Sequence, residues 1–301
     1  MAESNCFTPV ETSKSLVSIS EKKASLPIWK MLILGIFAGC YIGFGAHLAT
    51  TVGTGAFEYF GLKKLLMGAA FSVGLMLVVI AGAELFTGNN LMSVGLCAGK
   101  IKFGGFLRNW VVVYIGNLIG SLLLAFIIAM SSGLLNGPVG ATALQIAIDK
   151  TSAASIAHLD HNYAFFFRGI ACNWLVCLAV VMALASKDIT GKIFACFFPI
   201  MAFVASGFEH SVANMYFIPA GIWAKGFPKA VELATTAYAT ANPGKTLDLA
   251  GLNWTTMWTN NIISVTLGNI VGGAIFVGVL YFLAYVVGTE ACCTRKPDSK
   301  Q

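Results

Sequence analysis

Gly-Ala-Glu-Leu-Phe-Thr-Gly-Asn occupies residues 82–89, and Gly-Phe-Glu-His-Ser-Val-Ala-Asn occupies residues 207–214. Both octets fit one template, Gly-x-Glu followed by four residues and then Asn, and each lies inside a long apolar tract. An ionisable side chain at the centre of a bilayer costs about 2.5 to 3.5 kcal/mol unless it faces protein or water. Two such octets in matching tracts predict one site built from two halves.

The composition predicts an integral membrane protein. Of the 301 residues, 57% are hydrophobic and only 11% are charged, with a mean hydropathy of +0.79, whereas soluble domains carry about 25% charged residues. The 32 glycines fit this class, because transmembrane helices pack closely through small residues. The net charge of +6 comes from basic residues in loops and tails. A nucleic-acid partner is therefore not expected, since such binders gather basic residues on one face.

The sequence carries no sign of an enzyme, a metal site or a cofactor. Its eight cysteines lie mostly in apolar tracts and lack metal-site spacing. Neither a phosphate-binding glycine-rich loop nor a nucleophile elbow is present. The first 26 residues are polar and lack the apolar region of a signal peptide. They are expected to form a solvated tail or a surface helix.

Six apolar tracts predict the crossings of the membrane. Four have the length of one tilted helix, about 17 to 25 residues. The second and fifth are too long for one straight crossing and too short for two, and each contains an octet. A helix broken at the octet resolves this, and unpaired backbone at that depth must face protein or a wet cavity, which implies a pathway. The tracts span residues 28–52, 65–98, 109–132, 164–186, 193–224 and 258–288.

An internal repeat supports two related halves. Gly116-Asn117-Leu118-Ile119-Gly120 matches Gly268-Asn269-Ile270-Val271-Gly272, and Gly35-Ile36 matches Gly169-Ile170 more weakly. Three crossings per half place the second half upside down relative to the first. We expect an all-α membrane protein with six transmembrane helices, an inverted repeat of three plus three, and breaks in helices 2 and 5.

The predicted organisation has one transmembrane unit between two tails. Residues 1–27 form an amino-terminal tail, 28–288 the transporter domain with repeats 28–132 and 164–288, and 289–301 a carboxy-terminal tail. With the amino terminus inside, only seven of the 19 basic residues lie outside, as the positive-inside rule favours. Both termini are therefore expected in the cytoplasm, and the membrane is a plasma membrane or bacterial inner membrane.

His210 is the sharpest candidate for chemistry. An imidazole with an unperturbed pKa near 6.5 can exchange a proton at physiological pH, and in protonated form it would attract a small anion. The alternative is a structural histidine that satisfies a carbonyl in the break. The Thr87 hydroxyl in the other octet could bond the imidazole or a carboxylate, or it could cap a half helix.

The remaining octet residues predict a scaffold. Glu84 and Glu209 would brace the breaks by accepting from backbone amides, because a carboxylate on an anion path would oppose conduction. Asn89 and Asn214 would cap the second half helices, and the octets begin at Gly82 and Gly207. Several apolar residues could narrow a path on either side of His210, with packing or lipid contact as the alternative. These residues are Phe71, Leu75, Leu85, Phe86, Val176 and Phe203.

Three longer motifs resemble one known family. They are Ala83-Glu84-Leu85-Phe86-Thr87-Gly88, Arg168-Gly169-Ile170-Ala171-Cys172-Asn173-Trp174-Leu175-Val176-Cys177-Leu178, and Ala205-Ser206-Gly207-Phe208-Glu209-His210-Ser211-Val212-Ala213-Asn214-Met215. In this order they resemble the formate/nitrite transporter family, over roughly residues 28–288.

The resemblance implies an aquaporin-like protomer in a homopentamer, embedded in membrane lipid, with one substrate path in each protomer. The family's central histidine, loop threonine and pore asparagine fall on His210, Thr87 and Asn173. Its apolar constrictions fall on Phe71, Leu75, Leu85, Val176 and Phe203. Members move formate, nitrite, hydrosulfide, acetate or lactate, often with a proton.

One position departs from the family pattern. The family has a lysine sixteen residues before the pore asparagine, thought to draw anions inward, and this chain has Ala157 there. Lys150, His158, His161 or Arg168 are the candidates to replace that positive charge.

The sequence therefore predicts a channel or transporter for small monovalent weak-acid anions and protons, with formate first. An aquaporin-type channel for water or neutral solutes is the alternative, although neither octet continues into the Asn-Pro-Ala of that type. A non-transporting membrane scaffold is a third interpretation, and it leaves the intramembrane His and Glu residues unexplained.

Overall fold

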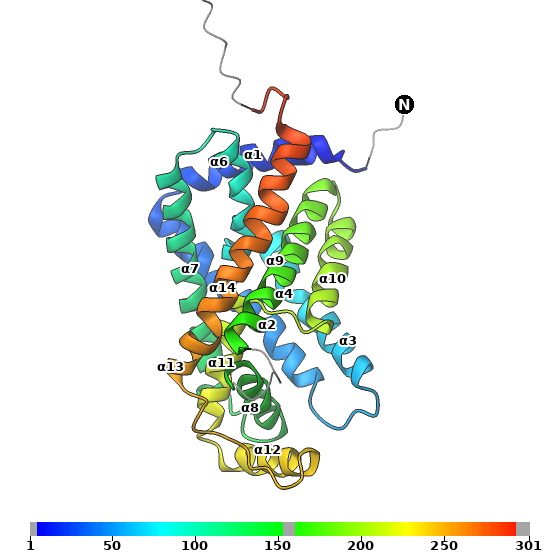
Figure 1. The fold of residues 1–301 in the computed structure, drawn as a ribbon, viewed down its shortest axis with the longest axis vertical. Coiled ribbons are helices and arrows are strands. Elements are labelled where there is room, and N and C mark those ends of the chain that lie inside the picture. Colours follow the sequence, from blue (N-terminus) through cyan, green and yellow to red (C-terminus); the bar gives the residue numbers. More distant parts are fainter. Residues whose placement is uncertain (1–4, 153–159, 293–301) are drawn as a thin grey trace, which may run out of the picture.

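The computed structural model describes residues 5–152 and 160–292, and the secondary-structure elements of this part of the chain are helices joined by loops. Its only strand-like contact within those ranges is an isolated bridge between Cys6 and Ser186. Figure 1 shows an elongated molecule in which α1 lies across one end, near α6, and α8 and α12 lie at the other. The expected all-α class is confirmed.

The helices follow one another along the whole described chain. In order they are α1 (Pro9–Ser25), α2 (Ile28–Val52), α3 (Phe60–Phe71), α4 (Val73–Met76), α5 (Phe86–Asn89), α6 (Ser93–Cys97), α7 (Phe103–Phe126), α8 (Pro138–Thr151), α9 (His161–Ala185), α10 (Ile189–Ala205), α11 (Ser211–Ala224), α12 (Pro228–Ala241), α13 (Trp254–Met257) and α14 (Ile263–Ile270). Wider π-helical turns continue several of them, at Leu77–Gly82, Ile127–Ser131, Trp258–Ile262, Val271–Val279 and Phe282–Val286, and a 3-10 turn covers Asn90–Met92.

Five helical stretches are long and apolar enough to cross a membrane. The helix Ile189–Ala205 is also apolar but shorter, as half of an interrupted crossing would be. The described chain is thus a multi-pass membrane protein, and the count of six crossings stays a prediction. The five stretches are Ile28–Val52, Phe60–Gly82, Phe103–Ser131, His161–Ala185 and Trp254–Val286.

Both octets interrupt a helix. The first stretch ends at Gly82, whose φ is 93°, and helix resumes at Phe86. In the second octet α10 ends at Ala205, Gly207 has a φ of 75°, and α11 begins at Ser211. Positive φ is open to glycine because it lacks a Cβ. The two octet glycines therefore let the chain leave each helix.

The two halves share a helix-packing contact. A Cβ on Gly120 of α7 would collide with the Ile36 carbonyl of α2, and a Cβ on Gly272 would collide with the Ile170 carbonyl of α9. Close backbone approach of this kind is how small residues hold transmembrane helices together. The sequence matches in the two halves thus mark the same contact, made twice.

The amino-terminal segment is a docked helix rather than a solvated tail. Thr8 and Glu11 form a capping box at the start of α1, which fixes the helix start. Leu16 and Val17 are buried and pack in one apolar cluster with residues of the first broken helix. Lys14 of α1 pairs with the exposed Glu290, with 2.9 Å between Nζ and Oε1. The surface-helix alternative therefore describes residues 9–25.

Candidate functional site

His210 and Thr87 meet across the two breaks. Nε2 of His210 lies 2.8 Å from Oγ1 of Thr87, and both side chains are buried. Thr87 lies in α5 and His210 is the N-cap of α11. The two octet residues singled out as candidates for handling the substrate are thus brought together.

The contacts of the imidazole assign its tautomer. Nδ1 of His210 accepts the backbone N–H of Ala213 at 3.0 Å. A backbone N–H can only donate, so Nδ1 carries no hydrogen, and a neutral imidazole then carries its hydrogen on Nε2. Nε2–H must donate to the Thr87 oxygen, which leaves the Thr87 hydroxyl hydrogen for another acceptor. The pair thus offers one uncommitted donor at a buried position.

Asn173 of α9 braces Thr87 through the backbone. Its Nδ2 donates to the Thr87 carbonyl at 3.2 Å and to the Asn269 carbonyl at 2.7 Å. The Cys177 thiol also lies 3.4 Å from the Thr87 carbonyl. The amide donor of Asn173 is therefore engaged with backbone, and its position fixes the threonine that faces His210.

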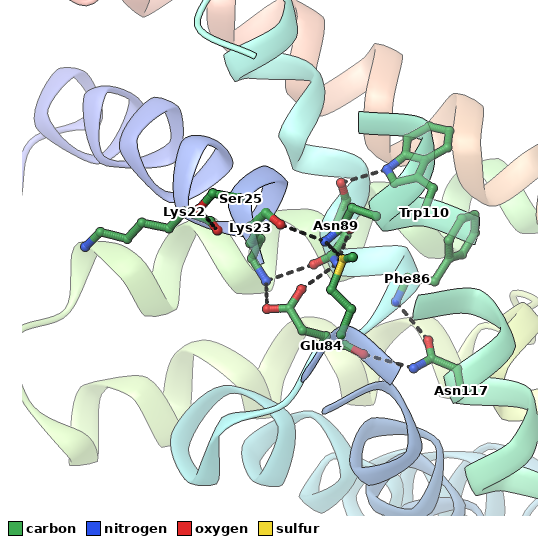
Figure 2. A network of polar contacts seen from close by, with 10 residues as sticks. Lys22, Lys23, Ser25, Glu84, Phe86, Asn89, Trp110 and Asn117 are labelled. Atoms are coloured by element: carbon green, nitrogen blue, oxygen red, sulfur yellow. Dashed lines mark hydrogen bonds and ion pairs between the residues drawn. The ribbon is translucent and has the colours of Figure 1, made fainter. Parts of the chain in front are cut away.

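An ammonium and a carboxylate pair beside the first break. Lys23 Nζ of α1 lies 2.6 Å from Oε1 of Glu84 and donates to Oδ1 of Asn89 at 2.9 Å. Asn89 Nδ2 in turn donates to the other Glu84 oxygen at 2.7 Å and to Oδ1 of Asn109 at 2.8 Å. Figure 2 shows Lys23 reaching from α1 into this network, whereas Lys22 points away from it. The buried carboxylate is thus neutralised locally.

The second break has the same arrangement. Lys150 of α8 lies 3.0 and 2.9 Å from the two carboxylate oxygens of Glu209. Asn214 Nδ2 donates to Glu209 at 2.6 Å and to Oδ1 of Asn261 at 2.7 Å. Each octet Glu therefore has a lysine, the octet Asn and one further asparagine close by.

The groups that donate to the two glutamates differ from the prediction. Glu84 and Glu209 were expected to accept from backbone amides, and instead they accept from lysine and asparagine side chains. Charge-assisted bonds of this kind are roughly twice as strong as neutral ones. The two carboxylates serve as anchors for Lys23 and Lys150, which come from outside the octets.

The caps of the half helices also differ from the prediction. Asn89 and Asn214 do not cap them. Asn117 accepts the N–H of Phe86 at 2.9 Å, and Asn269 accepts the N–H of Ser211 at 2.9 Å. In α11 His210 itself also caps, by accepting the Ala213 N–H, whereas the octet asparagines lie within the helical turns and are engaged with the glutamates.

The two capping asparagines also hold the extended backbone of the breaks. Asn117 Nδ2 donates to the carbonyls of Gly35 and Glu84 at 2.8 and 2.9 Å. Asn269 Nδ2 donates to those of Gly169 and Glu209 at 2.8 and 2.9 Å. Backbone groups freed by a break must be satisfied inside the protein at this depth. The repeat matches of the sequence thus correspond to one repeated set of hydrogen bonds.

A cavity of about 190 Å³ lies on the α1 side of the first break. It is mostly apolar, with Leu75 and Leu85 on its wall, and Lys23 and Asn89 supply polar atoms. Leu75 and Leu85 were both predicted to narrow a path. Residues of α1 cover the cavity, among them Leu16 and Ile19.

Aromatic rings occupy the vicinity of His210. The Phe203 ring centroid lies 6.0 Å from that of His210 and 5.7 Å from that of Phe71. Both predicted constriction residues are buried; Phe203 lies beside the imidazole, and Phe71 packs against Phe203. Val176 is buried in the same core cluster as both rings.

Phe86 faces elsewhere. Its ring packs on Tyr114 and Trp110 of α7, at 4.9 and 5.6 Å between centroids, and it is not part of the cavity wall. Figure 2 shows it on the Trp110 side of the network. The structure gives Phe86 a packing role, unlike the constriction role predicted for it.

Three of the four candidates to replace the positive charge of the family lysine lie within the described residues. Ala157 and His158 lie outside the described residues. Of the other candidates, Lys150 binds Glu209 directly, Arg168 stacks its guanidinium 5.8 Å from the Phe165 ring, and His161 lies 6.4 Å from the same ring. Lys150 thus supplies an ammonium beside the second break, although its charge is matched by the carboxylate of Glu209.

Within residues 5–152 and 160–292, no group of three or more His, Cys, Asp or Glu side chains is arranged to hold a metal ion. The site consists of hydrogen-bond donors, two neutralised ion pairs and apolar walls. Such a site can orient a small polar solute.

Comparison with known proteins assigns the family. The sequence profile described as formate/nitrite transporter matches residues 10–283. The chain belongs to this family. The match begins at residue 10, so it includes α1, which lies in the segment predicted as a tail. The family is one of transporters rather than enzymes.

Individual family members are similar over most of their length. A probable formate transporter of Methanothermobacter thermautotrophicus is 43% identical over 291 residues, covering 93% of this chain and 97% of that protein. A solved structure described as an FNT family ion channel has a TM-score of 0.76 and 30% identity, covering 91% of this chain and 98% of that one. A pentameric formate channel with formate bound has a TM-score of 0.70 and 40% identity, covering 86% and 98%.

Sequence reasoning missed several residues of the site. Lys23 was counted only among the basic residues expected on the cytoplasmic side, and Asn109 and Asn261 were not singled out. Asn117 and Asn269 were recognised as a repeat match without a role. Their signal was an asparagine at the same place in two apolar tracts, since a polar amide there must find partners inside the protein.

Proposed function

We propose that the chain is a channel-transporter for small monovalent anions of weak acids, with formate as the first substrate, moving together with a proton. The observation that carries this proposal is the buried His210–Thr87 pair with its uncommitted hydroxyl donor. Family membership and the formate-bound relative support the substrate class. The same relative is pentameric, which supports a homopentamer. We propose one path in each protomer, with membrane lipid around the assembly.

The proposed path runs from the cavity at α1 past the pair to the aromatic rings of Phe71 and Phe203. Its walls are apolar on both sides of His210. A bare anion in such surroundings is costly to hold, far more than a neutral polar group. Uptake of a proton converts formate to formic acid, which crosses the apolar stretches more easily. The Thr87 hydroxyl then donates to a substrate oxygen midway.

The geometry supports a role for His210 as a neutral hydrogen-bond partner. An imidazolium would carry a hydrogen on Nδ1, facing the Ala213 N–H that Nδ1 now accepts. Two donors in contact repel, so protonation of His210 would break the cap of α11. In this proposal the proton travels with the substrate, while His210 orients Thr87.

The two ion pairs serve the path as scaffold. Lys23 with Glu84 and Lys150 with Glu209 leave no net charge beside either break. A neutralised pair neither traps an anion, as a lone ammonium would, nor repels it, as a lone carboxylate would. They anchor the two breaks of the proposed transmembrane unit of residues 28–288, to which Lys23 reaches from α1.

The orientation follows the distribution of basic residues. We place the α1 end and both termini in the cytoplasm, and the α8 and α12 end outside, in a plasma membrane or bacterial inner membrane. Cys97 is exposed and lies at the α1 end. This orientation predicts that an impermeant thiol reagent reacts with Cys97 only after cells are opened. Reaction in intact cells contradicts it.

The function is tested by flux into proteoliposomes. Wild-type protein is expected to take up formate faster as the external pH falls, without appreciable water permeability, and His210→Phe is expected to abolish uptake. Empty vesicles give the background. Formate uptake at wild-type rate in His210→Phe removes the role given to His210, and water flux without formate flux favours the aquaporin-type alternative. Competition with nitrite, hydrosulfide, acetate and lactate in the same vesicles ranks the substrates.

A further inference from the structure

A basic groove lies on the α1 end of the molecule, away from the substrate path. It is formed by the last turns of α1, the segment before α7 and the first turn of α7, and encloses about 430 Å³. Its charged side chains are Lys100, Lys102, Arg108 and Glu21, so three cations face one carboxylate and the net charge is +2. The proposed transport function uses none of these residues.

The two lysines of the groove are uncommitted. Both side chains are exposed, and neither ammonium pairs with a carboxylate in residues 5–152 and 160–292. Arg108 is different, because its Nη2 donates to the carbonyls of Ala24 and Leu26 at 2.6 and 3.2 Å. Arg108 thus ties α7 to the end of α1 and shapes the groove. Lys100 and Lys102 remain free to bind a ligand.

The wall at the start of α7 adds unpaired donors. Lys102 is the N-cap of this 24-residue helix and makes no side-chain cap, so the first amides of the helix lack an intrahelical acceptor. Gly104 lines the groove, and a Cβ there would meet nothing within 4 Å. An anionic group can therefore approach the helix start directly. These features reinforce the lysines in favouring a negatively charged oxygen ligand.

Exposed apolar side chains beside the groove indicate its depth in the membrane. Two membrane-spanning stretches begin here, at Ile28 and Phe103. Trp29 and Phe103 are 64% and 63% exposed, and tryptophan is enriched at membrane–water interfaces. The groove thus lies where the headgroups of lipids meet the hydrocarbon, with basic side chains above exposed apolar ones. This arrangement suits a ligand with a charged head and an apolar tail.

We propose that this groove binds the phosphodiester headgroup of an anionic phospholipid, with Lys100 and Lys102 as the phosphate ligands and the acyl chains lying against Phe103 and Leu107. Basic pockets beside transmembrane helices on the cytoplasmic side bind acidic headgroups in this manner. A free phosphate shares the headgroup chemistry but gains nothing from the apolar wall. The exposed Leu107, one turn further along α7, continues that wall toward the hydrocarbon.

Native mass spectrometry of the full-length protein in neutral detergent tests the proposal. The readout is the apparent dissociation constant of the first bound phosphatidylglycerol, with phosphatidylcholine as the zwitterionic comparison. Each lysine near a lipid surface contributes about a fivefold change in binding. Lys100→Gln/Lys102→Gln is therefore expected to weaken phosphatidylglycerol binding about 25-fold and to leave phosphatidylcholine unchanged. Lys100→Arg/Lys102→Arg keeps the charges and is expected to retain most of the affinity.

Lys192→Gln/Lys229→Gln is the matched control, because it removes two lysine charges away from the groove. We expect it to bind phosphatidylglycerol as the wild type does, and all variants to melt at the wild-type temperature. The proposal is overturned if Lys100→Gln/Lys102→Gln keeps wild-type affinity, if the control loses as much, or if millimolar inorganic phosphate displaces the lipid. A salt titration of the wild type checks the result without a variant, because a phosphatidylglycerol preference that high salt does not weaken contradicts an electrostatic site.

Discussion

Replacing Lys23 by methionine removes one partner of the ion pair that holds the first break. Methionine keeps the length of the aliphatic stem, so the packing of α1 is largely preserved. Glu84 would be left with Asn89 as its remaining hydrogen-bond donor. The carboxylate would then be a buried charge without a counter-ion, and we expect the folded protein to be destabilised.

The size of the effect follows from burial. The side chains of Lys23 and Glu84 are only 23% and 9% exposed, and breaking a buried pair by removing one partner costs 3 to 5 kcal/mol. Because the Asn89 bond persists, the lower end applies, about 3 kcal/mol. By contrast, Lys229 and Glu232 are 57% and 65% exposed, and such pairs contribute at most about 1 kcal/mol.

The assay is the free energy of unfolding in mixed micelles, obtained from far-ultraviolet circular dichroism during titration with sodium dodecyl sulfate. Lys229→Met serves as the matched control. The double variant Lys23→Met/Glu84→Gln removes both charges and is expected to recover part of the lost stability, as a double-mutant cycle shows for coupled residues. The reasoning is refuted if Lys23→Met and Lys229→Met destabilise equally, or if neutralising Glu84 restores nothing.

Three further outcomes are expected. Asn269→Ala leaves the Ser211 N–H without its acceptor and leaves two carbonyls without their donor. The free energy of unfolding should therefore fall by at least about 2 kcal/mol. A fall of less than about 1 kcal/mol in the same titration counts against the capping role. Gly39→Ala brings a Cβ against the backbone of α7 and should lower the melting temperature, whereas Gly104→Ala meets open space and should not; equal melting temperatures would contradict the close helix contact. Phe86→Leu is expected to reduce stability by about 1 kcal/mol without changing which anions cross in vesicle competition assays, and an altered substrate order would return Phe86 to the path.

The interruptions of the helices were predictable from the sequence because each requires a local signal. A polar octet inside an apolar tract conflicts with a continuous membrane helix, and glycine at its start permits the positive φ found at Gly82 and Gly207. A bond between Thr87 and His210 was one of the alternatives that the octets offered, because each octet carries one side chain of this kind where the other has an apolar residue. Helix packing at Gly120 and Gly272 was implied by the repeated Gly-Asn-x-x-Gly.

The partners of the scaffold residues were not predictable in the same way. The contact between Lys23 and Glu84 joins residues 61 apart in the chain, and no local pattern marks a lysine in a polar amino-terminal segment as buried. The capping of Phe86 by Asn117 likewise depends on how α7 packs against the break. Tertiary packing determines which of several chemically suitable residues forms each of these contacts.

If His210 orients Thr87, the Thr87 hydroxyl is the group that meets the substrate. Position 212 of the second octet, equivalent to Thr87, is a valine that is fully buried. A valine is therefore compatible with this kind of helix turn. Thr87→Val removes the hydroxyl at nearly constant volume, and Thr87→Ser keeps it.

Formate uptake into proteoliposomes at several pH values, compared for wild type, Thr87→Val and Thr87→Ser, tests the central claim most directly. A hydrogen bond between neutral groups contributes about 0.5 to 1.5 kcal/mol, so Thr87→Val is expected to lose about two- to tenfold in uptake rate, while Thr87→Ser stays at the wild-type rate. Equal uptake by Thr87→Val and wild type, at matched melting temperature and incorporation, would contradict a substrate site at the His210–Thr87 pair.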